Sequence, residues 1–391
     1  MNQFDEAYFD AGINRVGTHC AKWDEMRRET GDPDMIPMWV ADMDFPSPPA
    51  VQQALEGAAR QGTWGYTHPC DEDFEALCGY WKRRHNTDIR PDDVLMSPCV
   101  VTGLRIAVRA LTREGDGLLI NPPIYGPFFA SIKESGRRIV ESPLVQDGEG
   151  RWSLNFEEME EKLASGEAKA VMFCSPHNPC GRVWSKEELT RLAALCAKYA
   201  APLICDEIHA DFVFAPGVHH SILTIPGGEN AVMLCAASKT FNIAGLQQSA
   251  IVCRDAEKRE KIAREMVASG VVSGNIFALA ATRAAYTDCD AWLDGLLCYL
   301  AGNRDFAAEY AARRWPKIRV TPLDATYLMW LDCRALNLSQ EDLMERILKA
   351  HVKVNDGLFF GELGRGFIRL NIGCPRGQLR QALERLDAVL A

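Results

Sequence analysis

Short apolar runs alternate with longer amphipathic segments through the middle of this chain. Several runs are apolar throughout rather than at every second position, which is typical of parallel strands covered on both faces. This alternation predicts a doubly wound α/β domain with a mainly parallel sheet. The predicted strands are Val94–Ser97, Leu118–Asn121, Ala170–Cys174, Leu203–Cys205, Val232–Ala236 and Ile251–Cys253.

Two of the intervening segments carry apolar residues at helical spacing, Thr102–Thr112 and Lys186–Tyr199. The second follows Ser185, a favourable N-cap residue, and has Glu188 three residues after that serine. This spacing is typical of a capping box, so we expect the second helix to begin directly after Ser185.

The pattern changes near residue 290, where helical and strand segments of a smaller α+β domain begin. The first 45 residues lack clear periodicity and predict an arm that packs on another part of the molecule. We therefore expect an arm at residues 1–45, a large domain at 46–288 and a small domain at 289–391. The elements expected in the small domain are Ala291–Arg313, Tyr327–Leu331, Gln340–Ala350, Phe367–Asn371 and Gln378–Leu390.

Composition narrows the class of protein. The 391 residues carry a formal net charge of −10, which argues against a general nucleic-acid binder because phosphate neutralisation needs a basic surface. No apolar stretch approaches the roughly 20 residues of a membrane helix, and the first ten residues do not resemble a signal peptide. The fourteen cysteines include no Cys-x-x-Cys pair, and many lie in apolar runs. We therefore expect reduced thiols in a soluble, cytoplasmic protein with no metal, nucleic-acid or membrane partner.

Chemically useful side chains follow the predicted strands. Ligands of a doubly wound sheet bind beyond the carboxyl ends of its strands. Those ends are followed by Tyr125, Asn178, Asp206 with His209, and Lys239. The loop 98–103 opens a helix whose free N–H groups could hold a phosphate. An aromatic ring, an amide, a carboxylate and a lysine are thus expected to meet in one crevice.

Each of these residues also has an ordinary structural interpretation. Asp206 could cap a helix, Asn178 could start a turn before Pro179, and Lys239 could be a solvated surface lysine. Tyr125 and His209 could be satisfied core residues. Pyridoxal phosphate is a cofactor that needs all five residue types. Its aldehyde, pyridine nitrogen, phenolic oxygen, flat ring and phosphate each require a partner.

Eight segments in chain order carry a family resemblance. They resemble the class I and II pyridoxal-phosphate-dependent aminotransferases of fold type I, and more narrowly the MalY/PatB branch of cystathionine β-lyase-like C–S lyases. That resemblance implies a large α/β domain and a small α+β domain. The segments are PMWVADMDF (37–45), GYTHP (65–69), SPCVVTG (97–103), PPIYGPF (122–128), SPHNPCGRVW (175–184), CDEIHADFV (205–213), SKTFNIAGLQ (238–247) and FIRLNIGCPR (367–376).

The resemblance implies roles at the cofactor ring. Lys239 is expected to form the Schiff base with the cofactor and then to act as acid and base at the substrate Cα. Asp206 is expected to pair with the pyridine nitrogen, and Tyr125 to stack on the ring. Asn178 and His209 are expected near the ring oxygen.

The resemblance also implies the phosphate site. Val101, Thr102 and Ser238 are expected to hold the phosphate, and Tyr66 to reach the phosphate of a neighbouring subunit, so that a homodimer shares its sites. Two positions depart from the family pattern. Gln247 stands where many aminotransferases carry a cation, and Cys99 stands where we expect glycine.

For the substrate, the resemblance implies that Arg369 binds the α-carboxylate with a bidentate fork. The backbone near Val40 and Ala41 is expected to help. Trp39 is a further candidate on the substrate side, with packing as an equal interpretation.

The implied function is a C–S β-lyase that cleaves L-cystathionine or related L-cysteine S-conjugates to a thiol such as homocysteine, pyruvate and ammonia. An aminotransferase of amino acids needs the same residues and stays open, as does a non-catalytic regulator on this fold. Asp206 to His209 also match a helicase-type D-E-x-H pattern, but no phosphate-binding G-x-x-x-x-G-K-[ST] loop accompanies it. A metal site at His209, Asp211, His219 and His220 and a dinucleotide site are weaker alternatives.

Overall fold

The structure is a computed structural model that describes residues 3–271 and 274–391. The first two residues of the predicted arm and residues 272 and 273 of the predicted large domain therefore lie outside it. Its helices are α1 (Glu6–Asp10), α2 (Met26–Thr30), α3 (Pro49–Arg60), α4 (Asp71–His85), α5 (Val100–Leu111), α6 (Pro127–Lys133), α7 (Phe156–Ala164), α8 (Lys186–Lys198), α9 (Ala237–Thr240), α10 (Ala256–Ala268), α11 (Ile276–Asp288), α12 (Asp290–Arg314), α13 (Gln340–Lys349) and α14 (Arg376–Leu390). Its strands are β1 (Ile36–Pro37), β2 (Val94–Ser97), β3 (Gly117–Ile120), β4 (Arg138–Glu141), β5 (Val145–Gln146), β6 (Trp152–Ser153), β7 (Ala170–Cys174), β8 (Leu203–Asp206), β9 (Val232–Cys235), β10 (Ser249–Cys253), β11 (Arg319–Val320), β12 (Leu328–Asp332), β13 (Val352–Lys353), β14 (Asn355–Asp356) and β15 (Phe367–Asn371).

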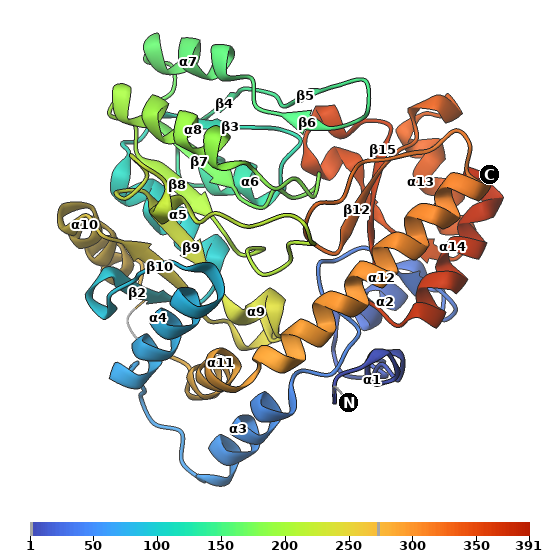
Figure 1. The fold of residues 1–391 in the computed structure, drawn as a ribbon, viewed down its shortest axis with the longest axis horizontal. Coiled ribbons are helices and arrows are strands. Elements are labelled where there is room, and N and C mark those ends of the chain that lie inside the picture. The colour runs from blue at the N-terminus through green and yellow to red at the C-terminus, as the bar shows by residue number, and fades with distance from the viewer. Residues whose placement is uncertain (1–2, 272–273) are drawn as a thin grey trace.

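A seven-stranded sheet in the order β2-β10-β9-β8-β7-β3-β4 forms the centre of the larger group of elements (Figure 1). The mainly parallel sheet expected from the sequence is confirmed. The exception is β10, which runs antiparallel to both β2 and β9. A strand that is buried on both faces is apolar throughout in either direction, so the residue pattern of β10 does not reveal its direction.

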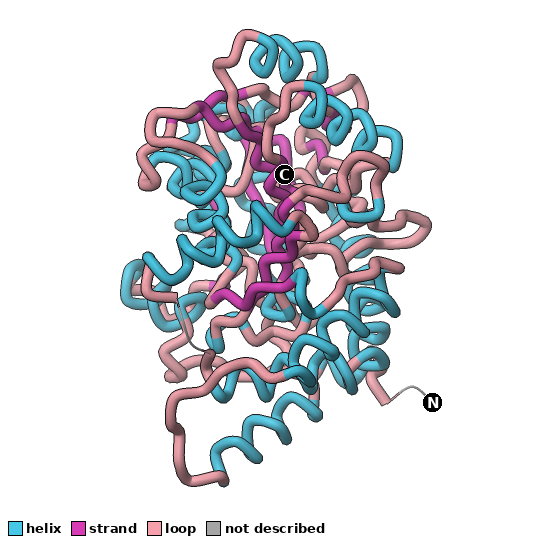
Figure 2. The backbone as a smooth tube through the Cα atoms, turned by 90° about the vertical axis from the view of Figure 1, so that its left-hand side faces the viewer, coloured by secondary structure: helices cyan, strands magenta, loops and turns pink. Residues whose placement is uncertain are grey.

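Helices enclose this sheet on both faces, as Figure 2 shows. Successive side chains of a strand point to opposite faces. Accordingly Met172 of β7 packs in one apolar cluster with residues of α5, α6 and α10, whereas Phe173 belongs to the cluster that contains α8. The predicted capping box at α8 is confirmed, since Ser185 Oγ accepts from the Glu188 N–H at 3.2 Å and the Glu188 carboxylate accepts from the Ser185 N–H at 2.7 Å.

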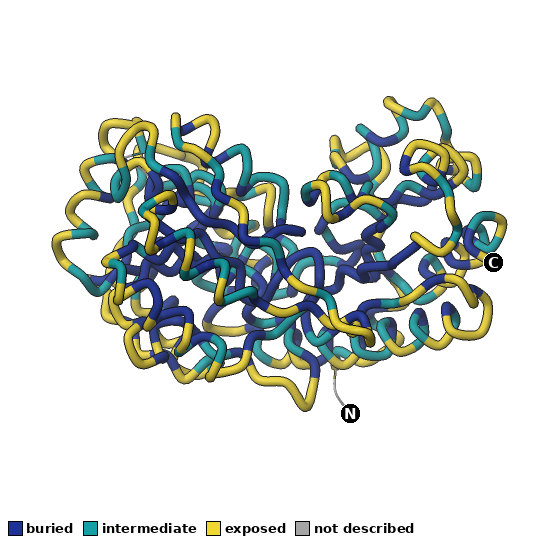
Figure 3. The backbone as a smooth tube through the Cα atoms, turned by 90° about the horizontal axis from the view of Figure 1, so that it is seen from above, coloured by how far each residue is buried: buried dark blue, intermediate teal, exposed yellow. Residues whose placement is uncertain are grey.

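A four-stranded antiparallel sheet in the order β11-β12-β15-β14 forms the smaller group, together with α13 and α14. The long helix α12 runs between the two groups (Figure 1). Buried residues gather at the centre of each group, as Figure 3 shows. The predicted segments of the small domain agree with α12, β12, α13, β15 and α14 to within two residues at each end.

Residues 3–45 pack on the smaller group and on α12. β1 pairs in parallel with β13, which joins Ile36 to Val352. Phe9 of α1 is buried against the rings of Phe45, Trp292 and Tyr299. The arm therefore belongs to the packed structure, although its sequence shows no helix or strand period.

All fourteen cysteines fall within the described residues and are free thiols, nine of them buried. No helix within residues 3–271 and 274–391 combines the length and the apolar character needed to cross a membrane.

Candidate active site

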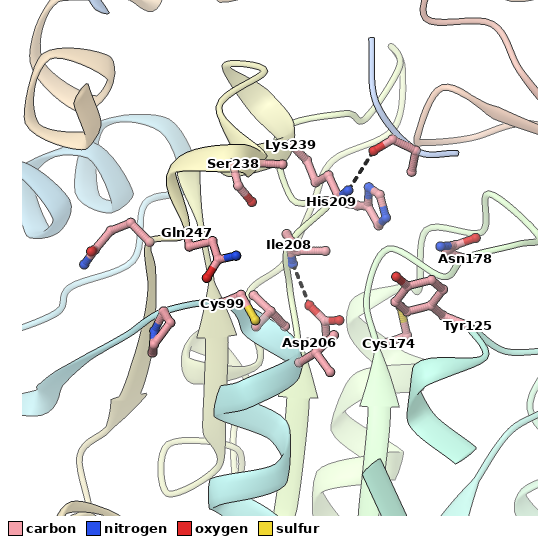
Figure 4. A pocket seen from close by; sticks show the side chains of 16 residues that line it. Cys99, Tyr125, Cys174, Asn178, Asp206, Ile208, His209, Ser238, Lys239 and Gln247 are labelled. Carbon is pink, nitrogen blue, oxygen red and sulfur yellow. Dashed lines mark hydrogen bonds between the residues drawn. The ribbon is translucent and has the colours of Figure 1, made fainter. Parts of the chain in front are cut away.

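A cavity of about 150 Å³ opens at the carboxyl ends of β7, β8 and β9 and at the start of α5 (Figure 4). The predicted site residues on its wall are Ala41, Val101, Tyr125, Asn178, Asp206, His209, Ser238 and Lys239. Sequence reasoning gave no role to six further wall residues, Pro98, Val100, Cys174, Ile208, Ala244 and Gln248. Each of these six lies within four residues of a predicted one or of Gln247, so adjacency to the motifs was the available signal.

Asp206 is the last residue of β8 and is buried. Its Oδ1 accepts a hydrogen bond from the Ile208 N–H at 3.0 Å, which is drawn in Figure 4. Burial raises the pKa of this carboxyl group to about 7, since a charged carboxylate loses hydration in the protein interior. A cationic N–H in the cavity would therefore find a strong acceptor there.

Lys239 lies in the short helix α9, directly after β9, and its Nζ donates to the Ala41 carbonyl at 2.6 Å. Burial lowers the pKa of this amine, and the positive charge of Arg369 lowers it further. Lys239 is therefore a partly desolvated amine that gives up its proton more readily than a surface lysine. That property suits a covalent nucleophile and a general base.

Asn178 and Arg369 form one buried unit. An Arg369 Nη1–H donates to Asn178 Oδ1 at 2.8 Å, and an Nη2–H donates to the Trp39 carbonyl at 3.0 Å and also to Asn355. The Arg369 Nε has no hydrogen-bond partner among residues 3–271 and 274–391 although the side chain is buried, and burial lowers the pKa of the guanidinium to about 10. A buried donor without a partner is costly, so the free Nε–H of Arg369 could bind a carboxylate.

His209 and Tyr125 complete the wall around Asp206 in Figure 4. Burial lowers the pKa of His209 to about 3, so the imidazole is neutral at physiological pH. Its Nδ1 has no partner among the described residues. Tyr125 presents a partly buried ring to the cavity. A flat aromatic ligand could thus stack on a ring and find a neutral imidazole beside it.

At the opposite end of the cavity lies the start of α5. Cys99 is its N-cap residue and lines the cavity, with Sγ 3.3 Å from Thr102 Oγ1. Val101 and Ser238 also line this end, whereas Thr102 bonds to Cys99 instead. The first N–H groups of a helix lack internal partners and attract anions. Gln247 also lines the cavity, so the position where the resemblance implies a cation presents an uncharged amide.

Four other predicted residues lie away from this cavity in the described chain. Tyr66 is fully exposed in the loop between α3 and α4. Arg369, Trp39 and Val40 lie behind the wall, where the Val40 carbonyl accepts from Asn371 Nδ2 at 2.6 Å. Trp39 and Val40 therefore act through backbone carbonyls that bind other protein groups.

Two residues of the alternative metal site, His219 and Asp211, bind other protein groups instead. His219 bonds to Glu207 at 2.9 Å, and Asp211 accepts from Tyr80 at 2.7 Å and from Thr240 at 2.6 Å. Asp211 also pairs with His85 at 2.8 Å. Within the described residues no group of three His, Cys, Asp or Glu side chains is arranged to hold a metal ion.

The wall offers a group for each part of pyridoxal phosphate. Lys239 could bind its aldehyde, Asp206 its ring nitrogen, Tyr125 the face of its ring, and the start of α5 its phosphate. The orphaned His209 Nδ1 offers a polar contact for the ring oxygen. The residues therefore fit this cofactor.

The fold and this donor set agree with the comparison with known proteins. The chain belongs to the aminotransferase class I and II family, whose model matches residues 33–386. It is similar to cystathionine β-lyase PatB of Bacillus subtilis (strain 168), at 38% identity over 386 residues that cover 98% of this chain and 100% of PatB.

Two solved structures share the fold over almost the whole chain. A PLP-bound protein of Clostridium difficile 630, provisionally named an aminotransferase, has a TM-score of 0.95 at 35% identity, covering 98% of this chain and 99% of that one. Cystalysin of Treponema denticola, which contains pyridoxal 5′-phosphate, has a TM-score of 0.94 at 32% identity, covering 98% of both chains.

Proposed function

We propose that this protein is a pyridoxal-phosphate-dependent C–S β-lyase. It would cleave L-cystathionine, or a related L-cysteine S-conjugate, with water to a thiol such as homocysteine, pyruvate and ammonia. The observation that carries the proposal is the meeting of Lys239 and Asp206 on one cavity wall, in a chain similar over its whole length to a cystathionine β-lyase.

The bound cofactor supplies an electron sink for the electrons of the broken Cα–H bond. Lys239 would hold the cofactor covalently and, once displaced by substrate, would accept the Cα proton at Nζ. Its lowered pKa favours that transfer. Asp206 would keep a proton on the ring nitrogen, and neutral His209 and Asn178 would bind near the ring oxygen.

Arg369 would bind the substrate α-carboxylate through its free Nε–H and part of its Nη donors. The bonds to Asn178 and to the Trp39 carbonyl fix the plane of the guanidinium before substrate arrives. A preoriented fork lowers the entropy cost of placing Cα beside Lys239.

The phosphate would be held by the start of α5, by Val101 and Thr102 through the backbone and by Ser238. Tyr66 is exposed and free to reach a second copy, so we propose a homodimer in which Tyr66 of the partner subunit completes the phosphate site.

We also propose the division into an arm (1–45), a large domain (46–288) and a small domain (289–391). Fourteen free thiols support a reducing, cytoplasmic location.

The test is a substrate panel with the purified holoenzyme, scoring pyruvate, ammonia and thiol release from L-cystathionine and other S-conjugates. We expect all three products in equal amounts without any added 2-oxo acid. A protein that releases neither pyruvate nor thiol would not be a C–S lyase.

An aminotransferase is the second candidate, favoured by the family match and by the C. difficile relative. It predicts amino-group transfer that depends on a 2-oxo acid and leaves the Cβ–S bond intact. The same panel separates the two, because only a lyase releases a thiol.

A further inference from the structure

The segment 39–44 brings two backbone carbonyls to the catalytic groups. The Ala41 carbonyl accepts from Lys239 Nζ at 2.6 Å, and the Trp39 carbonyl accepts from Arg369 at 3.0 Å. The segment belongs to no helix or strand. Its position must therefore be fixed by contacts other than a regular hydrogen-bond pattern.

Two cations of the arm supply such contacts. Lys22 Nζ donates to the Asp42 carbonyl and to the Asp44 carboxylate, both at 2.8 Å. Arg15 donates to the Asp42 carboxylate at 2.7 Å and to the Met43 carbonyl at 3.0 Å. Arg15 also reaches the Asp44 carboxylate at 3.5 Å. Lys22 thus binds one carboxylate and one backbone carbonyl of this short segment, and Arg15 binds two carboxylates and one carbonyl.

The Lys22–Asp44 pair is buried, with each residue only 1% exposed. The other oxygen of Asp44 accepts from Trp23 Nε1 at 2.9 Å, and Gln378 Nε2 donates to the Lys22-bound oxygen at 2.9 Å. An apolar pair could fill the same volume, and such replacements in other proteins are often neutral for stability. The ionic pair also orients the backbone, because Lys22 binds the carbonyl of Asp42, one residue from Ala41.

Asn371 of β15 holds the segment from the other side, donating to the Val40 and Asp42 carbonyls at 2.6 and 2.9 Å. It lies two residues from Arg369 on the same strand. The segment is therefore held between Arg15 and Lys22, which precede it in the arm, and the strand that carries Arg369.

We propose that Lys22 and Arg15 are positioning residues for the reaction. They act through segment 39–44, holding the Ala41 carbonyl against Lys239 and the Trp39 carbonyl against Arg369. The inference rests on the proposed function, which makes Lys239 the acid and base and Arg369 the carboxylate ligand. Loosening the segment would then disturb proton transfer and substrate binding together.

The sharpest variant is the double substitution Lys22→Met with Asp44→Leu, which removes both charges and keeps the net charge and an apolar filling. Arg15→Gln is the milder second variant. Arg385→Gln is the matched control, because Arg385 also ties the arm down, donating to the Asp34 and His351 carbonyls, but contacts neither segment 39–44 nor the cavity.

Three readouts on the holoenzymes decide the question: kcat and KM for L-cystathionine, the pH midpoint of the cofactor absorbance, and the melting temperature. The Lys239 nitrogen is faced by Asp42 of the arm, Asp206 of β8, His209 after β8 and Arg369 of β15. The pH midpoint of the cofactor bound to that nitrogen therefore reports on the placement of these groups. We expect the double variant to fold with kcat/KM lowered about ten- to hundredfold, through both kcat and KM, because small misplacements of reacting groups are costly. The absorbance midpoint should move by about half a pH unit or more although the net charge is unchanged.

Kinetic constants and a midpoint equal to those of Arg385→Gln would overturn the inference. If the double variant does not fold, Arg15→Gln decides by the same kinetic criterion, with Arg15→Lys expected to restore part of the loss. Absence of lyase activity in the unsubstituted protein would instead overturn the proposed function. In that case the absorbance midpoint still tests the positioning role.

Discussion

The candidate site has two parts that are built in different ways. Asp206, Asn178 and Lys239 present side chains from the ends of strands in a regular sheet. The arm side presents the backbone carbonyls of Trp39 and Ala41 on irregular chain. This chain is held by the buried Lys22–Asp44 pair, the partly exposed Arg15–Asp42 pair and the amide of Asn371. In the first part the sheet fixes the geometry and the side chain supplies the chemistry. In the second part the side chains fix the geometry and the backbone makes the contact.

The largest effect should follow from Lys239→Ala, which tests the strand-end part. We expect kcat for thiol release to fall by about 10⁴-fold or more, since both covalent and proton-transfer work are lost. Circular dichroism and the melting temperature of the apo protein should stay close to wild type. Activity within about tenfold of wild type would show that another group performs this work.

The arm part is tested by the single substitution Lys22→Met, which leaves buried Asp44 without its ammonium partner and with only Trp23, Gln378 and, at 3.5 Å, Arg15 as donors. We expect the free energy of unfolding to fall by about 3–5 kcal/mol, as for other broken buried ion pairs. Urea unfolding measures it. The double variant with Asp44→Leu should recover most of that loss, and a single variant no less stable than the double would contradict the importance of the pair.

Electrostatics of the strand-end part can be read from the pH dependence of apo-protein stability. Asp206 has a pKa of about 7 in the folded chain, above its ordinary 3.8. Between these values the folded state holds a proton that the unfolded state has lost, so stability falls as pH rises from about 4 to about 7. Relative to Asp206→Asn, wild type should lose about 1.4 kcal/mol per pH unit in that window. Buried His177 and His209 have lowered pKa values and act in the opposite direction in both proteins, so only the difference is diagnostic. Parallel stability curves for the two proteins would disprove the raised pKa.

A surface ion pair outside both parts of the site serves as the reference for the stability and activity changes of the other variants. Lys261 and Glu257 lie 2.7 Å apart on exposed positions of α10. We expect Lys261→Ala to change the free energy of unfolding by at most about 0.5 kcal/mol and to leave kcat unchanged. A larger loss would mean that surface pairs in this fold are worth more than usual, and the Lys22 result would need rescaling.

The two parts also differ in how far sequence predicted them. Asp206, Asn178, Tyr125 and Lys239 follow apolar runs, and the rule that ligands bind at the carboxyl ends of strands places them together. The cavity confirms that they meet.

The bond from Lys239 to the Ala41 carbonyl could not be predicted, because a carbonyl is present at every residue and carries no sequence signal. The antiparallel direction of β10 could not be predicted either, because a fully buried strand is apolar in both directions. The pairing of Lys22 with Asp44 could not be predicted because it joins two residues of an irregular arm. The placement of these groups depends on tertiary packing that no local period encodes.

The free cysteines have a consequence for a protein whose proposed product is itself a thiol. Thiolates, not thiols, attack disulfides, and burial raises the pKa of Cys174, Cys205 and Cys235 well above the usual value. These sulfurs stay protonated and out of reach, so oxidised product would find few partners for mixed disulfides in the folded chain. Exchange should be left to exposed Cys70 and Cys298 and to the half-buried Cys20, Cys78 and Cys99, of which Cys99 lines the cavity where the thiol would form.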